Sequence, residues 1–119
     1  MLSVAKKDLP VIFEEMVIFV GGPVLLAEYA PSGSDELGQN VLAAMGETNA
    51  CLLTNHGVVA CGREIKGAVK AATLVEKMAK IYWGALLAGH AEIVPEENYG
   101  KFLDYFKGLA STISTKKEK

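Results

Sequence analysis

The residue of this chain best suited to chemistry is His56, which lies in the segment NACLLTNHGVVACG, residues 49–62. Its neighbours Asn55 and Gly57 are ordinary turn formers, whereas histidine is not a favoured turn residue. An imidazole at the end of a strand can bind a divalent metal, act as a base or simply occupy the turn. A catalytic zinc takes about three protein ligands, so one histidine does not make a site. The residues alone leave the three roles of His56 open.

Nothing else in the sequence completes a metal site or an acid–base pair around this histidine. There is no HxH or HExxH pattern, and the acidic pairs at residues 14–15 and 96–97 are adjacent residues that point apart on a helix. The second histidine, His90, follows the longest predicted helix, where histidine usually caps carbonyl groups and interacts with the dipole. We therefore expect no functional role for His90.

The two cysteines, Cys51 and Cys61, flank the Asn-His-Gly turn at equal distances if the loop consists of residues 55–57. In that register the thiols would lie opposite each other in a hairpin, and a one-residue change of loop length would separate them. Two small buried thiols are the ordinary expectation for free cysteines. Neither thiol has a neighbour that marks an activated nucleophile, and the same holds for Ser34 and Thr54.

The elements that must position His56 are two short strands, ACLLTN and VVAC, which the spacing predicts to form a hairpin. Before them, PVLLAEYAP favours another short strand. A helix is predicted to begin at the N-cap Ser34, with Asp35 and Glu36 in its first turn, and to end at Gly46. One face of that helix should carry the apolar residues, which are Leu37, Val41 and Met45.

Three further helices are predicted. A short buried helix lies within residues 10–20 and ends at Gly21-Gly22. The longest covers residues 63–89, with Gly67 and Gly84 retained for close packing, and the last covers residues 99–109. The long helix has an apolar face (Ala68, Ala72, Val75, Ala79 and Leu86) and an opposite polar face that we expect to be solvated (Lys66, Lys70, Thr73, Lys77 and Lys80). The last helix presents Phe102, Leu103 and Phe106.

The order of these elements predicts an α/β (α+β) domain in which helices cover a mainly antiparallel sheet. The length of 119 residues suits one domain, and the net charge of −2 speaks against nucleic acid or an acidic membrane as partner. No apolar run has the length of a membrane span, and two cysteines fit a reduced, cytoplasmic protein. The polar stretch STISTKKEK, residues 111–119, is expected to be a disordered tail.

Four segments in this order resemble the class II aldolase/adducin family, most closely its L-fuculose-1-phosphate aldolase type. They are DLPVIFEEM, GGPVLLAEYAPSGSDELGQNV, ACLLTNHGVVACG and EIKGAVKAATLVEKMAKIY. The resemblance covers residues 6–107, so residues 1–110 are expected to form the C-terminal portion of such a domain. It implies part of a three-layer α/β/α sandwich with a mainly antiparallel sheet.

The resemblance also implies a function. Family enzymes hold zinc, or another divalent metal, with three histidines, of which the turn histidine matches His56. They cleave a sugar phosphate to a hydroxyketone phosphate and an aldehyde, and they are usually homo-oligomers, often tetramers. The HxH pair, an acid/base glutamate and the phosphate-binding loops are expected to precede Met1. No catalytic or cofactor-binding residue is therefore assigned in this chain, and Glu14 stands where the fuculose-phosphate enzymes place a tyrosine.

Two further readings follow from these departures. The chain is expected to be inactive alone, and it could instead be a non-enzymatic assembly module or a remnant of the same family. The related pentulose-phosphate epimerases share the same C-terminal motifs, so the resemblance leaves the reaction and the sugar open.

Overall fold

The computed structural model describes residues 1–108, and the predicted tail at 111–119 lies outside them. The elements, in chain order, are α1 (Leu2–Ala5), α2 (Glu14–Phe19), β1 (Leu26–Ala27), α3 (Asp35–Met45), β2 (Ala50–Leu53), β3 (Gly57–Ala60), α4 (Ile65–Leu87) and the 3₁₀ turn η1 (Glu96–Asn98). Residues 100–108 are helical as well. The order of predicted helices and strands is confirmed, and α1 is an addition that the sequence did not suggest.

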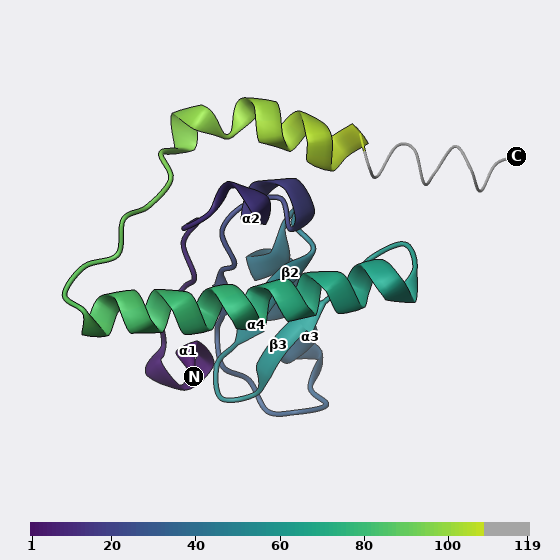
Figure 1. The fold of residues 1–119 in the computed structure, drawn as a ribbon. Coiled ribbons are helices and arrows are strands. Elements are labelled where there is room, and N and C mark those ends of the chain that lie inside the picture. The colour runs from purple at the N-terminus through teal and green to yellow at the C-terminus, as the bar shows by residue number, and fades with distance from the viewer. Residues whose placement is uncertain (109–119) are drawn as a thin grey trace, which may run out of the picture.

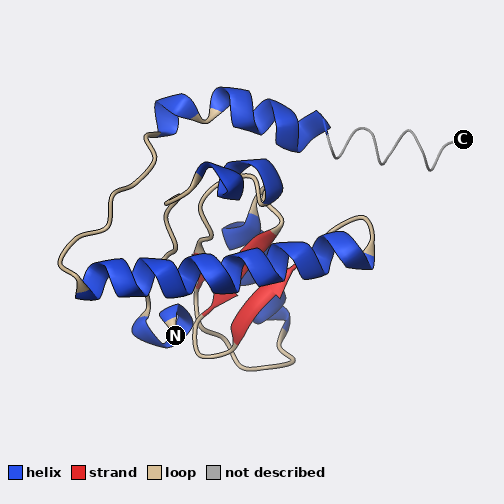
Figure 2. Ribbon diagram, in the orientation of Figure 1, coloured by secondary structure: helices blue, strands red, loops and turns tan. Residues whose placement is uncertain are grey.

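The three strands form one mixed sheet in the order β1-β2-β3 (Figure 2). Strand β1 pairs with β2 in parallel over two residues, and β2 pairs with β3 in antiparallel over four. An antiparallel bridge between Leu9 and Val24 lies just before β1. The longer ladder is thus the hairpin that the sequence predicted, and it ends at the turn that carries His56.

The register of this hairpin differs from the one considered for the cysteines. Leu53 pairs with Gly57, so the loop is the three residues 54–56. Cys51 consequently pairs with Val59 instead of Cys61. Cys51 is buried, but Cys61 is exposed, so the expectation of two buried thiols is wrong for Cys61. Cys61 lies one residue beyond the end of β3, and its side chain is exposed there.

Helices cover both faces of the sheet (Figure 1). On one face α3 packs against β1 and β2, and the thiol of Cys51 approaches the carbonyl of Val41 at 3.9 Å. On the other face Leu52 shares the main apolar core with Val75 and Met78 of α4. This arrangement of helix, sheet and helix confirms the α/β fold class.

The ends of the shorter helices follow the predicted signals. The hydroxyl of Ser34 accepts a hydrogen bond from the backbone N–H of Leu37 at 3.2 Å, as an N-cap does. Helix α2 ends before Gly21 and Gly22, whose φ angles of 99° and 147° would strain residues with side chains. The chain then turns directly into the segment that leads to β1.

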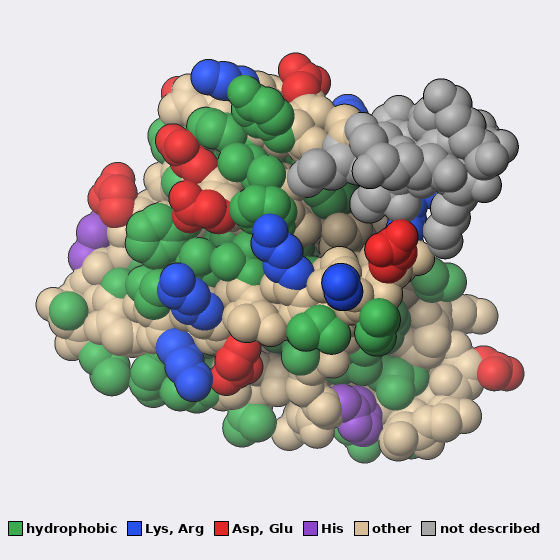
Figure 3. Space-filling model, turned by 45° about the vertical axis from the view of Figure 1, so that its right-hand side comes forward, with side chains coloured by type: hydrophobic (Ala, Val, Ile, Leu, Met, Phe, Trp, Pro, Cys, Tyr) green, Lys and Arg blue, Asp and Glu red, His purple; other side chains and the backbone are tan. Residues whose placement is uncertain are grey.

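Helix α4 buries Ala71, Val75 and Met78, while the lysines of its predicted polar face are exposed. Lys and Arg side chains alternate with acidic and apolar ones on the face shown in Figure 3. Apart from the chain neighbours and the helix's own backbone, no heavy atom of the described residues lies within 4 Å of a Cβ built on Gly67 or Gly84, so close packing does not explain these glycines. Among residues 1–108, no helix is both long enough and apolar enough to cross a bilayer.

Candidate functional site around His56

The turn that carries His56 is closed by its own backbone and is held in place by α1. Asn55 adopts φ 63° and Gly57 φ 119°, both in the left-handed region that these residue types tolerate. The backbone N–H of His56 donates to the carbonyl of Leu53 at 3.0 Å, which closes the loop. The N–H of Asn55 donates to the carbonyl of Ser3 at 3.3 Å, so α1 holds the tip of the turn.

Thr54 anchors the base of the same turn. Its hydroxyl, which is buried, donates to the carbonyl of Ala27 at 2.9 Å, and its backbone N–H donates to the same carbonyl at 3.3 Å. Since Ala27 ends β1, the turn is tied to the neighbouring strand. The sequence suggested Thr54 only as a nucleophile without a partner, and the structure gives it this positioning role instead.

The imidazole of His56 is held from two sides. Its Nε2 lies 2.8 Å from the carbonyl oxygen of Ala30, and its ring stacks on that of Tyr29 with centroids 5.6 Å apart and planes 10° from parallel. A carbonyl can only accept, so Nε2 carries the hydrogen in this arrangement. In the neutral ring the free lone pair is then on Nδ1, the atom available to a proton or a metal ion.

The described residues do not by themselves fit a zinc site. Between Met1 and Gly108 no three side chains of His, Cys, Asp or Glu come together in a way that could hold a metal. A catalytic zinc needs about three protein ligands, and His56 supplies one. What this part of the molecule offers is one imidazole with a fixed ring and a free nitrogen.

His90 lies elsewhere on the surface and takes no part in this site. Its Nε2 is 2.9 Å from a carboxylate oxygen of Glu92, and the two side chains are 77% and 90% exposed. Such an exposed pair contributes little to stability. The prediction that the His90 side chain caps α4 is wrong, because the helix ends at Leu87 and the ring turns to Glu92 instead.

The two thiols differ in their readiness to react. Burial raises the pKa of the Cys51 thiol, and the nearby Cys61 raises it further. Cys61 is exposed, with its sulfur 3.8 Å from that of Met45. A raised pKa disfavours the thiolate, which is the nucleophilic form. Cys51 is therefore a structural thiol.

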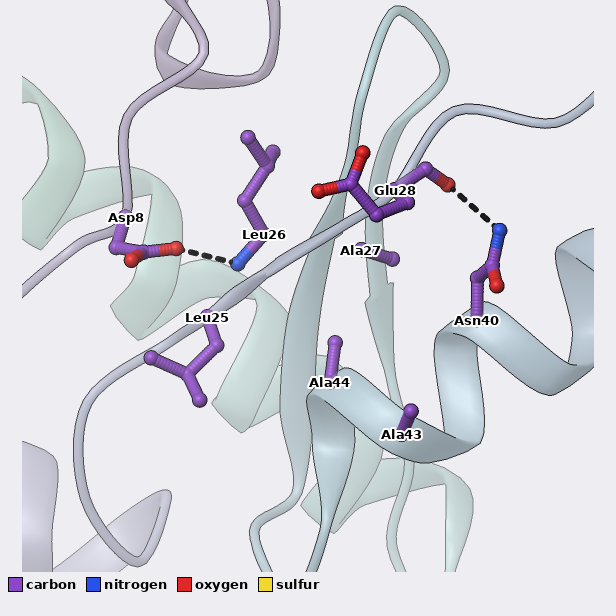
Figure 4. A pocket seen from close by; sticks show the side chains of 8 residues that line it. All are labelled: Asp8, Leu25, Leu26, Ala27, Glu28, Asn40, Ala43 and Ala44. Atoms are coloured by element: carbon purple, nitrogen blue, oxygen red, sulfur yellow. Dashed lines mark hydrogen bonds between the residues drawn. The ribbon is translucent and has the colours of Figure 1, made fainter.

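An open pocket of about 300 Å³ lies between β1 and α3 (Figure 4). The carboxylate of Asp8 accepts from the backbone N–H of Leu26 at 2.7 Å, and the amide of Asn40 donates to the carbonyl of Glu28 at 3.1 Å. Sequence reasoning missed Asp8 and Asn40, because no local pattern marks a side chain that bonds a strand 12 or more residues away. Both polar groups form hydrogen bonds with backbone groups at or next to β1, on the side away from β2.

Comparison with known proteins places this fold in a family. The family model described as "Class II Aldolase and Adducin N-terminal domain" matches residues 1–83. The chain is 41% identical over 96 residues to a Rhodospirillum rubrum protein named 5-methylthioribulose-1-phosphate/5-deoxyribulose-1-phosphate aldolase, covering 80% of this chain and 43% of that protein. It is 28% identical over 107 residues to the L-fuculose phosphate aldolase of Escherichia coli K12, covering 89% and 50%.

The solved structures agree with the sequences. A structure of an L-fuculose 1-phosphate aldolase superposes with a TM-score of 0.83 and 34% identity, over 89% of this chain and 50% of that one. The chain thus spans about half the length of the curated relatives it matches. The family model, which matches residues 1–83, includes the sheet, α3, the His56 turn and α4 up to Trp83. The chain belongs to the class II aldolase and adducin family.

Proposed function

We propose that this chain is part of a divalent-metal-dependent aldolase that cleaves a ketose 1-phosphate to a hydroxyketone phosphate and an aldehyde. The observation that carries the proposal is the fixed imidazole of His56 in a chain whose relatives are named sugar-phosphate aldolases. The names of these relatives share a ketose phosphate as substrate. The family to which the chain belongs is generally metal-dependent, which is consistent with a free imidazole nitrogen at this turn.

The similarities favour a 5-deoxypentulose 1-phosphate over L-fuculose 1-phosphate as the sugar. Identity is 41% to the protein named for methylthioribulose and deoxyribulose phosphates, against 28% and 34% to two proteins named for fuculose phosphate. The resemblance first seen in the sequence pointed to the fuculose type, and both sugars remain candidates to be compared directly.

His56 would be one of about three protein ligands of the metal, and the others would come from outside the described residues. A single histidine should hold zinc weakly, because each missing ligand removes geometry and charge neutralisation. We therefore propose that residues 1–119 alone are inactive. A cytoplasmic location and a homo-oligomer, a tetramer as the resemblance implies, belong to the same proposal.

An aldol-cleavage assay tests this function. The chain would be purified alone and also co-expressed with the part of the Rhodospirillum rubrum relative that lies outside the match. Release of the hydroxyketone phosphate would be followed with 5-deoxyribulose 1-phosphate and with L-fuculose 1-phosphate. We expect cleavage only in the co-expressed complex, and faster with the first sugar. Cleavage by the chain alone, or none by an isolated complex loaded with zinc, would contradict the proposal.

A further inference from the structure

Three sulfur atoms lie where the end of α3 covers the open end of the hairpin. The sulfur of Cys61 is 3.8 Å from that of Met45, which is the last residue of α3. The thiol of Cys51 approaches the carbonyl of Val41, about one helical turn earlier, at 3.9 Å. Helix α3 thus meets both cysteines along one side, Cys51 through its backbone and Cys61 through a thioether.

The hairpin register places the two thiols on the same face of the sheet. Cys51 pairs with Val59, and the N–H of Cys61 donates to the carbonyl of Asn49 at 2.8 Å, so the cysteines are diagonal neighbours. Such neighbours have Cα atoms about 7–8 Å apart, and their side chains come closer. Burial raises the pKa of the Cys51 thiol, and the nearby Cys61 raises it further. A cation between the two sulfurs would relieve the repulsion between their thiolates.

The donor atoms indicate which cation would fit. Thiolates and thioethers are soft ligands that favour Cu(I), whereas zinc takes cysteine, histidine and carboxylate ligands. Among residues 1–108, no three side chains of His, Cys, Asp or Glu come together in a way that could hold a metal. With metal–sulfur bonds of about 2.3 Å, as in zinc thiolates, two ligands of a trigonal site lie about 4 Å apart. The separation of 3.8 Å between Cys61 and Met45 agrees with that geometry.

We infer that Cys51, Cys61 and Met45 form a three-coordinate site for a soft monovalent cation, Cu(I). Binding replaces the protons of both thiols by one metal ion, so two protons are released and the loaded site carries one negative charge. The exposed Cys61 gives the ion access, and the buried Cys51 forms the inner wall. Cys51 is structural in the metal-free chain and becomes a ligand when the ion displaces its proton. The inference depends on the positions of the sulfurs and not on the proposed aldolase function.

Anaerobic titration of the reduced chain with Cu(I) tests the site, with bicinchoninic acid as a coloured chelator that competes for the ion. We expect one ion per chain, and X-ray absorption should show three sulfur neighbours at about 2.3 Å. Cys61→Ser should weaken binding by at least about 100-fold, and Cys51→Ala and Met45→Leu by at least about tenfold each.

Two further variants are matched controls. Met78→Leu removes a thioether from α4, on the other face of the sheet, and His56→Ala removes the imidazole at the far end of the hairpin. Both should bind Cu(I) as tightly as the natural chain.

Three results would overturn the inference. They are no ion held against the chelator, an ion shared between two chains, and binding that Met45→Leu and Cys51→Ala leave unchanged. The last result would mean that the exposed thiol alone captures the ion. If Cys51→Ala does not fold, Met45→Leu still decides, because leucine and methionine have similar volumes. Since binding and not cleavage is measured, failure of this site would leave the aldolase proposal standing.

Discussion

At the residue scale, the histidine turn shows what a sequence can and cannot specify. Asn55 and Gly57 are residue types that predicted a turn, and both adopt positive φ angles there. The partners of His56 could not be read in the same way, because Tyr29 and the Ala30 carbonyl lie 26 or more residues away in the sequence. Only the folded chain brings them beside the ring. The sequence identified the candidate residue, and tertiary contacts determine which of its nitrogens is free.

The different burial of the two cysteines also depends on tertiary contacts that the sequence does not reveal, and it leads to a first prediction. A thiol reagent at neutral pH should modify the exposed Cys61 rapidly and the buried Cys51 only on unfolding. Labelling followed by mass spectrometry measures this, and Cys61→Ser provides the control, which should leave the native chain unlabelled. Rapid labelling of both thiols in the native chain would contradict the register found for the hairpin.

The raised pKa of Cys51 also has a consequence for stability. Folding favours its neutral thiol, so the stability linked to this group is complete below the unfolded pKa. That stability falls as the pH rises above the unfolded value. Denaturant melts of the natural chain and of Cys51→Ala at increasing alkaline pH should therefore converge. Parallel loss of stability in both proteins would mean that Cys51 is not responsible.

At the element scale, the predicted ends of α3 agree with the structure, because helix capping depends on residues that are neighbours in the chain. Ser34→Ala removes the side-chain cap at the N-terminus of α3 and should lower the free energy of unfolding by about 1 kcal/mol. Ser32→Ala, a substitution in the preceding exposed turn, is the control and should change it little. Chemical denaturation measures both, and equal effects would refute the capping role.

The glycines of α4 were misjudged because their surroundings are set by tertiary packing. Gly67 and Gly84 have open space where a Cβ would lie, so Gly67→Ala and Gly84→Ala should each stabilise the chain by about 0.5–1 kcal/mol. Gly21→Ala should destabilise it, because φ is 99° there and a Cβ would lie 2.8 Å from the ring of Phe106. Thermal melts would show this opposite sign. Destabilisation by both helix substitutions would mean that α4 packs more closely than described.

At the scale of the whole molecule, the order of elements and the α/β class followed from local patterns of charge, apolar spacing and turn residues. What could not follow was the pairing of β1 with β2 and the one-residue shift of the hairpin register. These depend on contacts such as Asp8 to Leu26, which join residues far apart in the chain. Among residues 1–108, His56 is not joined by two further side chains that could hold a metal, which is consistent with the proposal that the other ligands come from elsewhere.

His56 is proposed to supply a metal ligand to an aldolase site, and one measurement tests this role most directly. The rate of ketose 1-phosphate cleavage by the co-expressed complex should be compared for the natural chain, His56→Ala and His90→Ala. We predict a loss of at least about 100-fold in kcat for His56→Ala, together with loss of bound zinc. His90→Ala, which removes only an exposed contact with Glu92, should retain activity within about twofold. Undiminished cleavage by the His56→Ala complex would contradict the account.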